Sequence, residues 1–186
     1  MKRFVWLNVL VLLILMSTEV YGQKSDKNAE ELKVILIRHG EKPEKGGNLT
    51  CRGLNRSLQL PTVIHAKFGV PDFTYVPTLK MGDKTSHSRM FETVVPLAVK
   101  YNLVINSKID EKDTMGLATE IKAQKGTVLV VWEHSAIAGI VHALGVTEEV
   151  KWPGSDFDSI WIITYKDGKA ILTKDNEGLN PSEDCP

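Results

Sequence analysis

Two strongly apolar runs stand out in the pattern of hydrophobic and polar positions. Lys33 to Ile37 leads directly into Arg38-His39-Gly40, and Thr127 to Trp132 leads directly into Glu133-His134. Continuous apolar runs of this length are typical of strands covered on both faces of a parallel sheet. Open α/β sheets bind their ligands beyond the carboxyl ends of such strands. The pattern therefore predicts a site at these strand ends, with a sharp turn at Gly40.

Helical and strand-like segments alternate through the rest of the chain. Leu60, Ile64 and Phe68 recur at fourfold spacing, which predicts one face of a helix, and Pro61 is expected to start, kink or split that helix. Asp167-Gly168 between two apolar stretches predicts a hairpin. The predicted helices cover residues 53–68, 90–100, 114–125 and 137–144, and the predicted strands cover residues 33–37, 73–76, 103–105, 127–132, 159–165 and 169–173.

This order predicts an α/β three-layer sandwich. The central sheet is expected to be mostly parallel, with helices on both faces and a C-terminal antiparallel hairpin. No shift in composition divides residues 33–186, so we interpret them as a single domain, preceded by a polar, flexible lead-in at residues 23–32.

The first 22 residues differ in composition from the rest of the chain. Lys2-Arg3 precedes an apolar run from Phe4 to Met16, and small residues follow, which predicts a signal peptide cleaved before Gln23. The run is shorter than the ~20 residues that span a bilayer, and an uncleaved membrane anchor is the alternative. We therefore expect an exported protein, periplasmic or extracellular, with no membrane span after cleavage.

Composition and charge narrow the choice of partners. Hydrophobic residues make up 42% and charged residues 25%, an ordinary globular balance, and the formal net charge is zero. A neutral chain has no broad attraction to nucleic acid or to anionic membranes. Export also permits a disulfide between Cys51 and Cys185, which would tie the C-terminal tail to the loop after the first strand; the alternative is a buried Cys51 and a free Cys185.

Four motifs resemble those of the histidine phosphatase superfamily, which includes phosphoglycerate mutases and histidine acid phosphatases. They occur in the family's order within residues 33–165: Arg38-His39-Gly40, Leu49-Thr50-x-x-Gly53, Arg89-x-x-Glu92-Thr93 and Val130-Val131-x-x-His134. Residues 38–43 and 132–134 resemble segments of small exported bacterial members. The resemblance implies a phosphoglycerate mutase-like fold and a metal-independent phosphoric monoester hydrolase. No cofactor is implied, and the expected partner is a phosphorylated small-molecule substrate.

The resemblance also implies the catalytic residues. His39 would attack phosphorus through a neutral ring nitrogen and carry a phosphohistidine intermediate, on phosphate monoesters or phosphoramidates. Arg38, Arg89 and His134 would surround the equatorial oxygens, where positive side chains stabilise the charge of the transition state. Arginine suits this role because its planar guanidinium binds two oxygens at once.

The motifs do not identify the proton donor for the leaving group. Glu133 is the first candidate because it lies beside the phosphate site, and Glu111 or Asp113 lies roughly where mutase-like members place their acid. Water, or a leaving group that departs unaided, is the remaining alternative. Lys42 and Arg56 are expected to add outer substrate-binding charge, and the alternative for Arg56 is a solvated helix side chain.

Two other functions are compatible with these residues. The first is a metal-dependent hydrolase, in which two histidines and two carboxylates would bind a divalent ion: His39, His134, Glu41 and Glu133. The positive charge of the nearby arginines opposes a metal at this place. An anion pocket without a competent acid would instead be a binding module for phosphorylated ligands.

The loop segment from Trp152 to Asp158 is expected to form a wall of the site. Its aromatic residues Trp152 and Phe157 either stack on the substrate or cap the core. Because no stretch of the chain is long enough for a cap domain, we expect an open, shallow site.

Overall fold

The two apolar runs form neighbouring parallel strands at the centre of a sheet. In the computed structural model, which describes residues 31–80 and 86–186, β1 (Lys33–Arg38) pairs with β4 (Thr127–Trp132) along its whole length. The register places Arg38 opposite Trp132. The residues that follow the two strands, His39 and Glu133, are therefore neighbours at the carboxyl edge of the sheet.

The remaining strands extend this sheet on both sides, in the order β3-β2-β4-β1-β5-β6. β2 (Phe73–Tyr75) and β3 (Ile105–Asn106) continue the parallel part. β5 (Ser159–Lys166) runs antiparallel to β1 and forms the C-terminal hairpin with β6 (Lys169–Asn176). The predicted fold class is confirmed.

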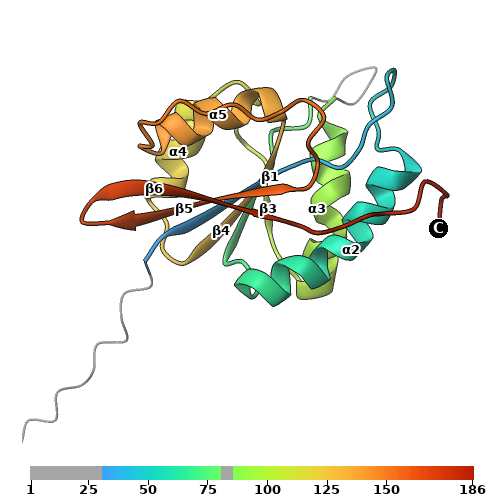
Figure 1. Ribbon diagram of the computed structural model, residues 1–186, viewed down its shortest axis with the longest axis horizontal. Coiled ribbons are helices and arrows are strands. Elements are labelled where there is room, and N and C mark those ends of the chain that lie inside the picture. Colours follow the sequence, from blue (N-terminus) through green and yellow to red (C-terminus); the bar gives the residue numbers. More distant parts are fainter. Residues whose placement is uncertain (1–30, 81–85) are drawn as a thin grey trace, which may run out of the picture.

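Helices cover both faces of the sheet, so the strands are buried between two helical layers (Figure 1). One layer contains α2 (Cys51–Phe68) and α3 (Ser88–Tyr101), and the other contains α4 (Thr114–Lys122) and α5 (His134–Ala143). This arrangement explains why β1 and β4 are apolar throughout, since successive side chains of a strand point to opposite faces.

The side chains of β1 alternate between two hydrophobic cores. Val34 and Leu36 pack in the core shared with α4 and α5, whereas Ile35 and Ile37 pack in the core shared with α2 and α3. Full burial of an aliphatic side chain contributes about 1.5–3 kcal/mol, so this pattern fixes the facing of β1 firmly. Continued by one step, the alternation puts His39 on the α2 and α3 side.

The two helices on this side both contain a proline that does not interrupt them. Pro61 lies inside α2 and Pro96 lies inside α3, so the expectation that Pro61 splits or starts its helix is wrong. α2 begins two residues earlier than predicted because Thr50 caps it, with Oγ1 accepting from the backbone N–H of Gly53 at 3.1 Å.

The C-terminal tail runs from β6 across α2 (Figure 1). Cys185 forms a disulfide with Cys51, so the tail is covalently fixed to the first residue of α2. None of the helices in the described part of the chain is long and apolar enough to cross a membrane. The predicted signal peptide, residues 1–22, lies outside the described residues.

Candidate active site

His39 directly follows β1, and its imidazole is completely buried. Nδ1 lies 2.7 Å from the backbone carbonyl oxygen of Gly40. A carbonyl oxygen only accepts hydrogen bonds, so Nδ1 carries a hydrogen and donates it. The ring is therefore held in one orientation, in which Nε2 is the nitrogen available for chemistry.

Glu133 faces Nε2 of His39, with Oε2 at 3.0 Å. Leu129 and Val131 of β4 point to the same core as Ile37, and the alternation continues to Glu133. Because Nδ1 already donates and a carboxylate only accepts, this contact requires one further proton on the His39–Glu133 pair.

Glu133 does not hold that proton at neutral pH. Burial acts to raise the pKa of Glu133, but the hydrogen bond from His39 and the charges of His39, His134 and Arg38 lower it to about 2. The other carboxylate oxygen, Oε1, lies 2.5 Å from Nδ1 of His134 without the angle of a hydrogen bond. Glu133 is thus an ionised carboxylate surrounded by positive charge.

Arg38 is buried beneath the loop that precedes β5. Its Nη1 donates to the backbone carbonyls of Gly154 (2.6 Å) and Asp156 (3.2 Å), and its guanidinium carbon lies 3.8 Å from the ring centroid of Phe157. Burial lowers the pKa of Arg38 in spite of the nearby Glu133 carboxylate, but an arginine keeps its charge in proteins. The loop therefore fixes a cation beside His39.

Three buried nitrogens of this region have no hydrogen-bond partner among the described residues: Nε of Arg38, Nε of Arg89 and Nδ1 of His134. Arg89 lies in the first turn of α3, and its Nη1 donates to the carbonyl of Gly46 at 3.3 Å. Burial has the largest influence on the pKa of Arg38, followed by the neighbouring carboxylates. The positive charge of Arg89 also lowers this pKa. An unsatisfied buried donor costs about 1–3 kcal/mol, so such a group suits a site whose ligand supplies acceptors.

Gly40 is required by close packing and not by a turn. Its φ is not positive and the backbone has neither a turn nor a bend at Gly40, so the predicted sharp turn is wrong. A Cβ on Gly40 would lie 2.9 Å from the carbonyl oxygen of Gly53, and a Cβ on Gly53 would lie 2.4 Å from the carbonyl oxygen of Glu41. The Arg-His-Gly and Leu-Thr-x-x-Gly motifs therefore contact each other through their backbones, at Gly40 and Gly53. This contact places α2 against the active-site loop.

The three candidate acids have different surroundings. Asp113 caps α4 by accepting a hydrogen bond from the backbone of its first turn, and Glu111 lies 2.8 Å from Nε2 of His87. Within residues 31–80 and 86–186, Glu133 is the candidate that contacts His39. The geometry therefore favours Glu133, as the first candidate named from the sequence.

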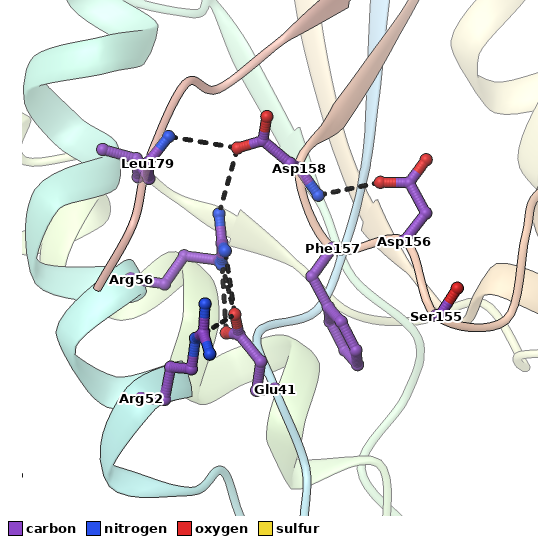
Figure 2. Close-up of a pocket in the computed structure, with 8 residues that line it drawn as sticks. All are labelled: Glu41, Arg52, Arg56, Ser155, Asp156, Phe157, Asp158 and Leu179. Atoms are coloured by element: carbon purple, nitrogen blue, oxygen red, sulfur yellow. Dashed lines mark hydrogen bonds and ion pairs between the residues drawn. The ribbon is translucent and has the colours of Figure 1, made fainter. Parts of the chain in front are cut away.

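Of the two outer charges, Arg56 does not lie as expected. Arg56 is only 3% exposed, so the alternative of a solvated side chain is wrong. Its guanidinium binds Glu41 through Nε (3.0 Å) and Nη2 (2.8 Å), and its Nη1 lies 3.5 Å from Asp158 (Figure 2). The same Nη1 donates to Glu177 at 2.5 Å. Because carboxylates engage these donors, the geometry disfavours a direct contact of Arg56 with substrate. Lys42 is exposed on the loop after β1, and its contact with substrate stays a prediction.

The candidate metal ligands do not converge. The carboxylate of Glu41 faces Arg56 and Arg52, whereas Glu133 faces His39 and His134. No group of three or more metal-ligating side chains is present in the described residues.

The two aromatic residues of the loop have separate roles. Trp152 is buried and packs against Trp161 with ring centroids 4.8 Å apart, so it belongs to the core. Phe157 lies beside the site, with its ring centroid 6.1 Å from that of His39. Phe157 also lines a cavity of about 510 Å³ between this loop and α2 (Figure 2).

Comparison with known proteins identifies the fold. No protein-family model matches the sequence, and no curated protein is significantly similar to it. Among solved structures, the protein histidine phosphatase SixA complexed with tungstate superposes with a TM-score of 0.57 at 16% identity, covering 78% of this chain and 97% of SixA.

Two further structures agree with this match. A mycobacterial glucosyl-3-phosphoglycerate phosphatase with inorganic phosphate has a TM-score of 0.56 at 13% identity, covering 77% of this chain and 95% of its own. Phosphoglycerate mutase from Bacillus anthracis has a TM-score of 0.51 at 15% identity, covering 78% of this chain and 92% of its own.

The chain therefore has the three-layer α/β fold of the phosphoglycerate mutase type. These neighbours are members of the histidine phosphatase superfamily, so the resemblance drawn from the four motifs is confirmed at the level of fold.

Proposed function

We propose that the protein is an exported phosphatase that hydrolyses phosphate monoesters or phosphoramidates through a phosphohistidine on His39. The observation that carries this proposal is the orientation of His39, whose Nδ1–H is bound by the Gly40 carbonyl while Nε2 faces the carboxylate of Glu133. Two structural neighbours were solved with tungstate and with inorganic phosphate, which are tetrahedral oxyanions. The same fold is thus known to bind ligands of the shape that this site would take.

Binding of the phosphoryl group prepares the nucleophile. Its oxygens accept from Arg38, Arg89 and His134, and the buried Nε atoms of the two arginines lack partners among the described residues. The negative charge of the phosphoryl group favours the neutral form of the adjacent Glu133. As Nε2 of His39 approaches phosphorus, its lone pair is needed for the new bond, and its proton passes to Glu133. Nε2 then has a free lone pair beside the phosphorus atom.

Phosphoryl transfer follows in two balanced steps. In the first, Nε2 of His39 forms a bond to phosphorus, the bond from phosphorus to the leaving group breaks, and Glu133 gives its proton to the leaving atom. In the second, water attacks phosphorus as Glu133 accepts a proton from it, the nitrogen–phosphorus bond breaks, and inorganic phosphate is released. The proton returns to Nε2, which restores the resting pair.

Turnover of an aryl phosphate by the protein beginning at Gln23 tests this proposal. We expect hydrolysis between roughly pH 4 and 8 that survives a chelator, is inhibited by vanadate and is lost in His39→Ala. Activity lost only to the chelator would contradict the phosphohistidine mechanism. Vanadate binding without any turnover of aryl, alkyl or phosphoramidate substrates would instead support a phosphate-binding module.

Export is tested separately from activity. We expect the full chain expressed in a bacterium to be recovered in the periplasm or medium with Gln23 as its first residue, because residues 1–22 have the pattern of a signal peptide. Recovery of the intact chain in the membrane fraction would indicate an uncleaved anchor.

A further inference from the structure

The residues after β6 form a C-terminal strap, residues 177–185, which crosses α2 (Figure 1). The Cys51–Cys185 disulfide fixes its far end to the first residue of α2. Polar contacts from the first two turns of α2 hold the middle: Arg52 donates to Asn180 and Glu183 (both 3.3 Å), and Asn55 donates to the backbone carbonyls of Ser182 (2.9 Å) and Asp184 (2.7 Å). The strap is therefore attached at several points.

The near end of the strap enters a buried charge cluster. Glu177 is 5% exposed and binds Nη1 of Arg56, and its backbone N–H donates to the carbonyl of Asp158 at 2.6 Å. The backbone N–H of Leu179 donates to Oδ1 of Asp158 at 3.1 Å (Figure 2). The strap is thus hydrogen-bonded to both Arg56 and Asp158.

Arg56 connects the strap to the nucleophile. Its fork binds both oxygens of Glu41, which is two residues after His39. The residue between them, Gly40, supplies the carbonyl that holds Nδ1 of His39. A shift of Arg56 would move Glu41, and with it the group that sets the hydrogen position on the imidazole.

Asp158 connects the strap to the phosphate-binding arginine. The two preceding residues are Phe157, whose ring packs on the Arg38 guanidinium, and Asp156, whose carbonyl accepts from Arg38. The same loop supplies the carbonyl of Gly154, the shortest contact of Arg38. A shift of Asp158 would therefore move the support of Arg38.

We propose that Glu177 is a positioning residue of the active site and that the Cys51–Cys185 disulfide keeps it in place, so that oxyanion affinity depends on the attached strap. The strap acts through Arg56 on His39 and through Asp158 on Arg38. This inference rests on the proposed function for its effect on turnover, but oxyanion binding is measurable without turnover.

Calorimetric titration with tungstate tests the role of Glu177. We expect Glu177→Ala to bind tungstate roughly tenfold more weakly than the wild type, because small displacements of binding groups have effects of this size or larger. Glu177→Gln keeps an acceptor for Arg56 and is expected to bind within about twofold of the wild type. The matched control is Asp175→Ala, which removes the 2.9 Å ion pair of β6 with Lys67 of α2 and should not change the affinity.

A spectroscopic measurement separates positioning from general loss of stability. The ¹⁵N shifts of the His39 ring are expected to change in Glu177→Ala, and not in Asp175→Ala, because the hydrogen bond from Nδ1 to Gly40 depends on the Arg56 connection. Unchanged shifts together with unchanged tungstate affinity in Glu177→Ala would overturn the inference.

Reduction of the disulfide tests the strap without changing Glu177. A dithiol supplies two electrons and two protons, breaks the sulfur–sulfur bond and leaves two thiols. We expect the reduced wild type and the Cys51→Ser/Cys185→Ser variant to lose affinity for tungstate by roughly tenfold, and the dithiol to have no further effect on the variant.

The outcomes distinguish the two proposals. Equal tungstate affinity in the oxidised and reduced wild type, at a temperature where both are folded, would overturn the role of the strap alone. Absence of tungstate binding by the oxidised wild type would overturn the proposed function and this inference with it.

Discussion

Arg38 and Arg56 are almost equally buried, at 2% and 3% exposure, yet their surroundings differ. Carboxylates of Glu41 and Glu177 bind the guanidinium of Arg56. Arg38 is held by backbone carbonyls and an aromatic ring, and its Nε has no partner among the described residues. Arg38 therefore keeps a donor for a ligand, whereas the donors of Arg56 join segments of the fold.

The buried glutamates of the two regions show the same contrast. Positive neighbours lower the pKa of Glu133 to about 2 against the effect of burial. Burial raises the pKa of Glu177 to about 8, because Asp158 and Glu41 add to burial and share the opposing charge of Arg56. The region of His39 is thus positive and suited to an anion, and the region of Arg56 is neutralised internally.

Removal of Arg56 is expected to have the largest effect, and on stability. Arg56→Ala leaves the Glu41 carboxylate without its cation and the buried Glu177 without its hydrogen-bond donor, which should lower the free energy of unfolding by about 3–5 kcal/mol. Urea denaturation measures this change, with Lys67→Ala as a control for an exposed ion pair worth under about 1 kcal/mol. An unchanged midpoint in Arg56→Ala would contradict the structural role of this cluster.

Removal of Arg38 is expected to act on turnover instead. Arg38→Ala should lower kcat/KM by roughly 10²–10³-fold, because a charged donor to the transition state is lost, with a change in unfolding free energy below about 1 kcal/mol. Steady-state kinetics and urea denaturation on the same preparation measure both quantities. Loss of stability with retained turnover would reverse the contrast between the two arginines.

Glu133→Gln separates the acid from the binding groups. We expect the rate to fall about 10²-fold on an alkyl phosphate, and less on a nitrophenyl phosphate, because a good leaving group does not need a proton. The control is Glu111→Gln, since Glu111 pairs with His87 and not with His39. If the dependence on the leaving group arises in Glu111→Gln instead, Glu111 is the acid.

The opposite pKa shifts predict opposite effects of pH on stability. Glu177 holds its proton in the folded state up to about pH 8, but its unfolded form ionises near 4.5, so its contribution to stability falls as pH rises between these values. Glu133, with a pKa of about 2, contributes stability above pH 4.5 that is lost as pH falls towards 2.

Chemical denaturation of the wild type and Glu177→Gln across these pH values measures the first effect. The difference in unfolding free energy between the two proteins is expected to change by about 4 kcal/mol between pH 4.5 and 8. A constant difference would show that Glu177 is ionised throughout.

The sequence predicts the sheet because strands buried on both faces consist of continuous apolar residues. The four motif segments are visible directly as short residue patterns. The side chains expected at the strand ends, Arg38, His39 and His134, do lie at one edge of the sheet. The contact of Glu133 with His39 is different, because it depends on β4 lying next to β1, and strand order leaves no mark in local periodicity.

Other features of the site have no signal in the sequence. Gly154 and Asp156 hold Arg38 through backbone carbonyls, which every residue possesses. Arg56 has the spacing of a helix residue near the site, and only the approach of Glu177 from the far end of the chain shows why it is buried. The sequence permits a disulfide between Cys51 and Cys185, but only the path of the strap shows that the two residues meet.

The central claim is that His39 carries the phosphoryl group, and rapid-quench mass spectrometry during turnover of a phosphoramidate tests it most directly. The account predicts an acid-labile, alkali-stable phosphoryl group on His39, absent in His39→Ala and suppressed by vanadate. Release of phosphate at the full rate with no phosphoenzyme, or with the label on another residue, would contradict it.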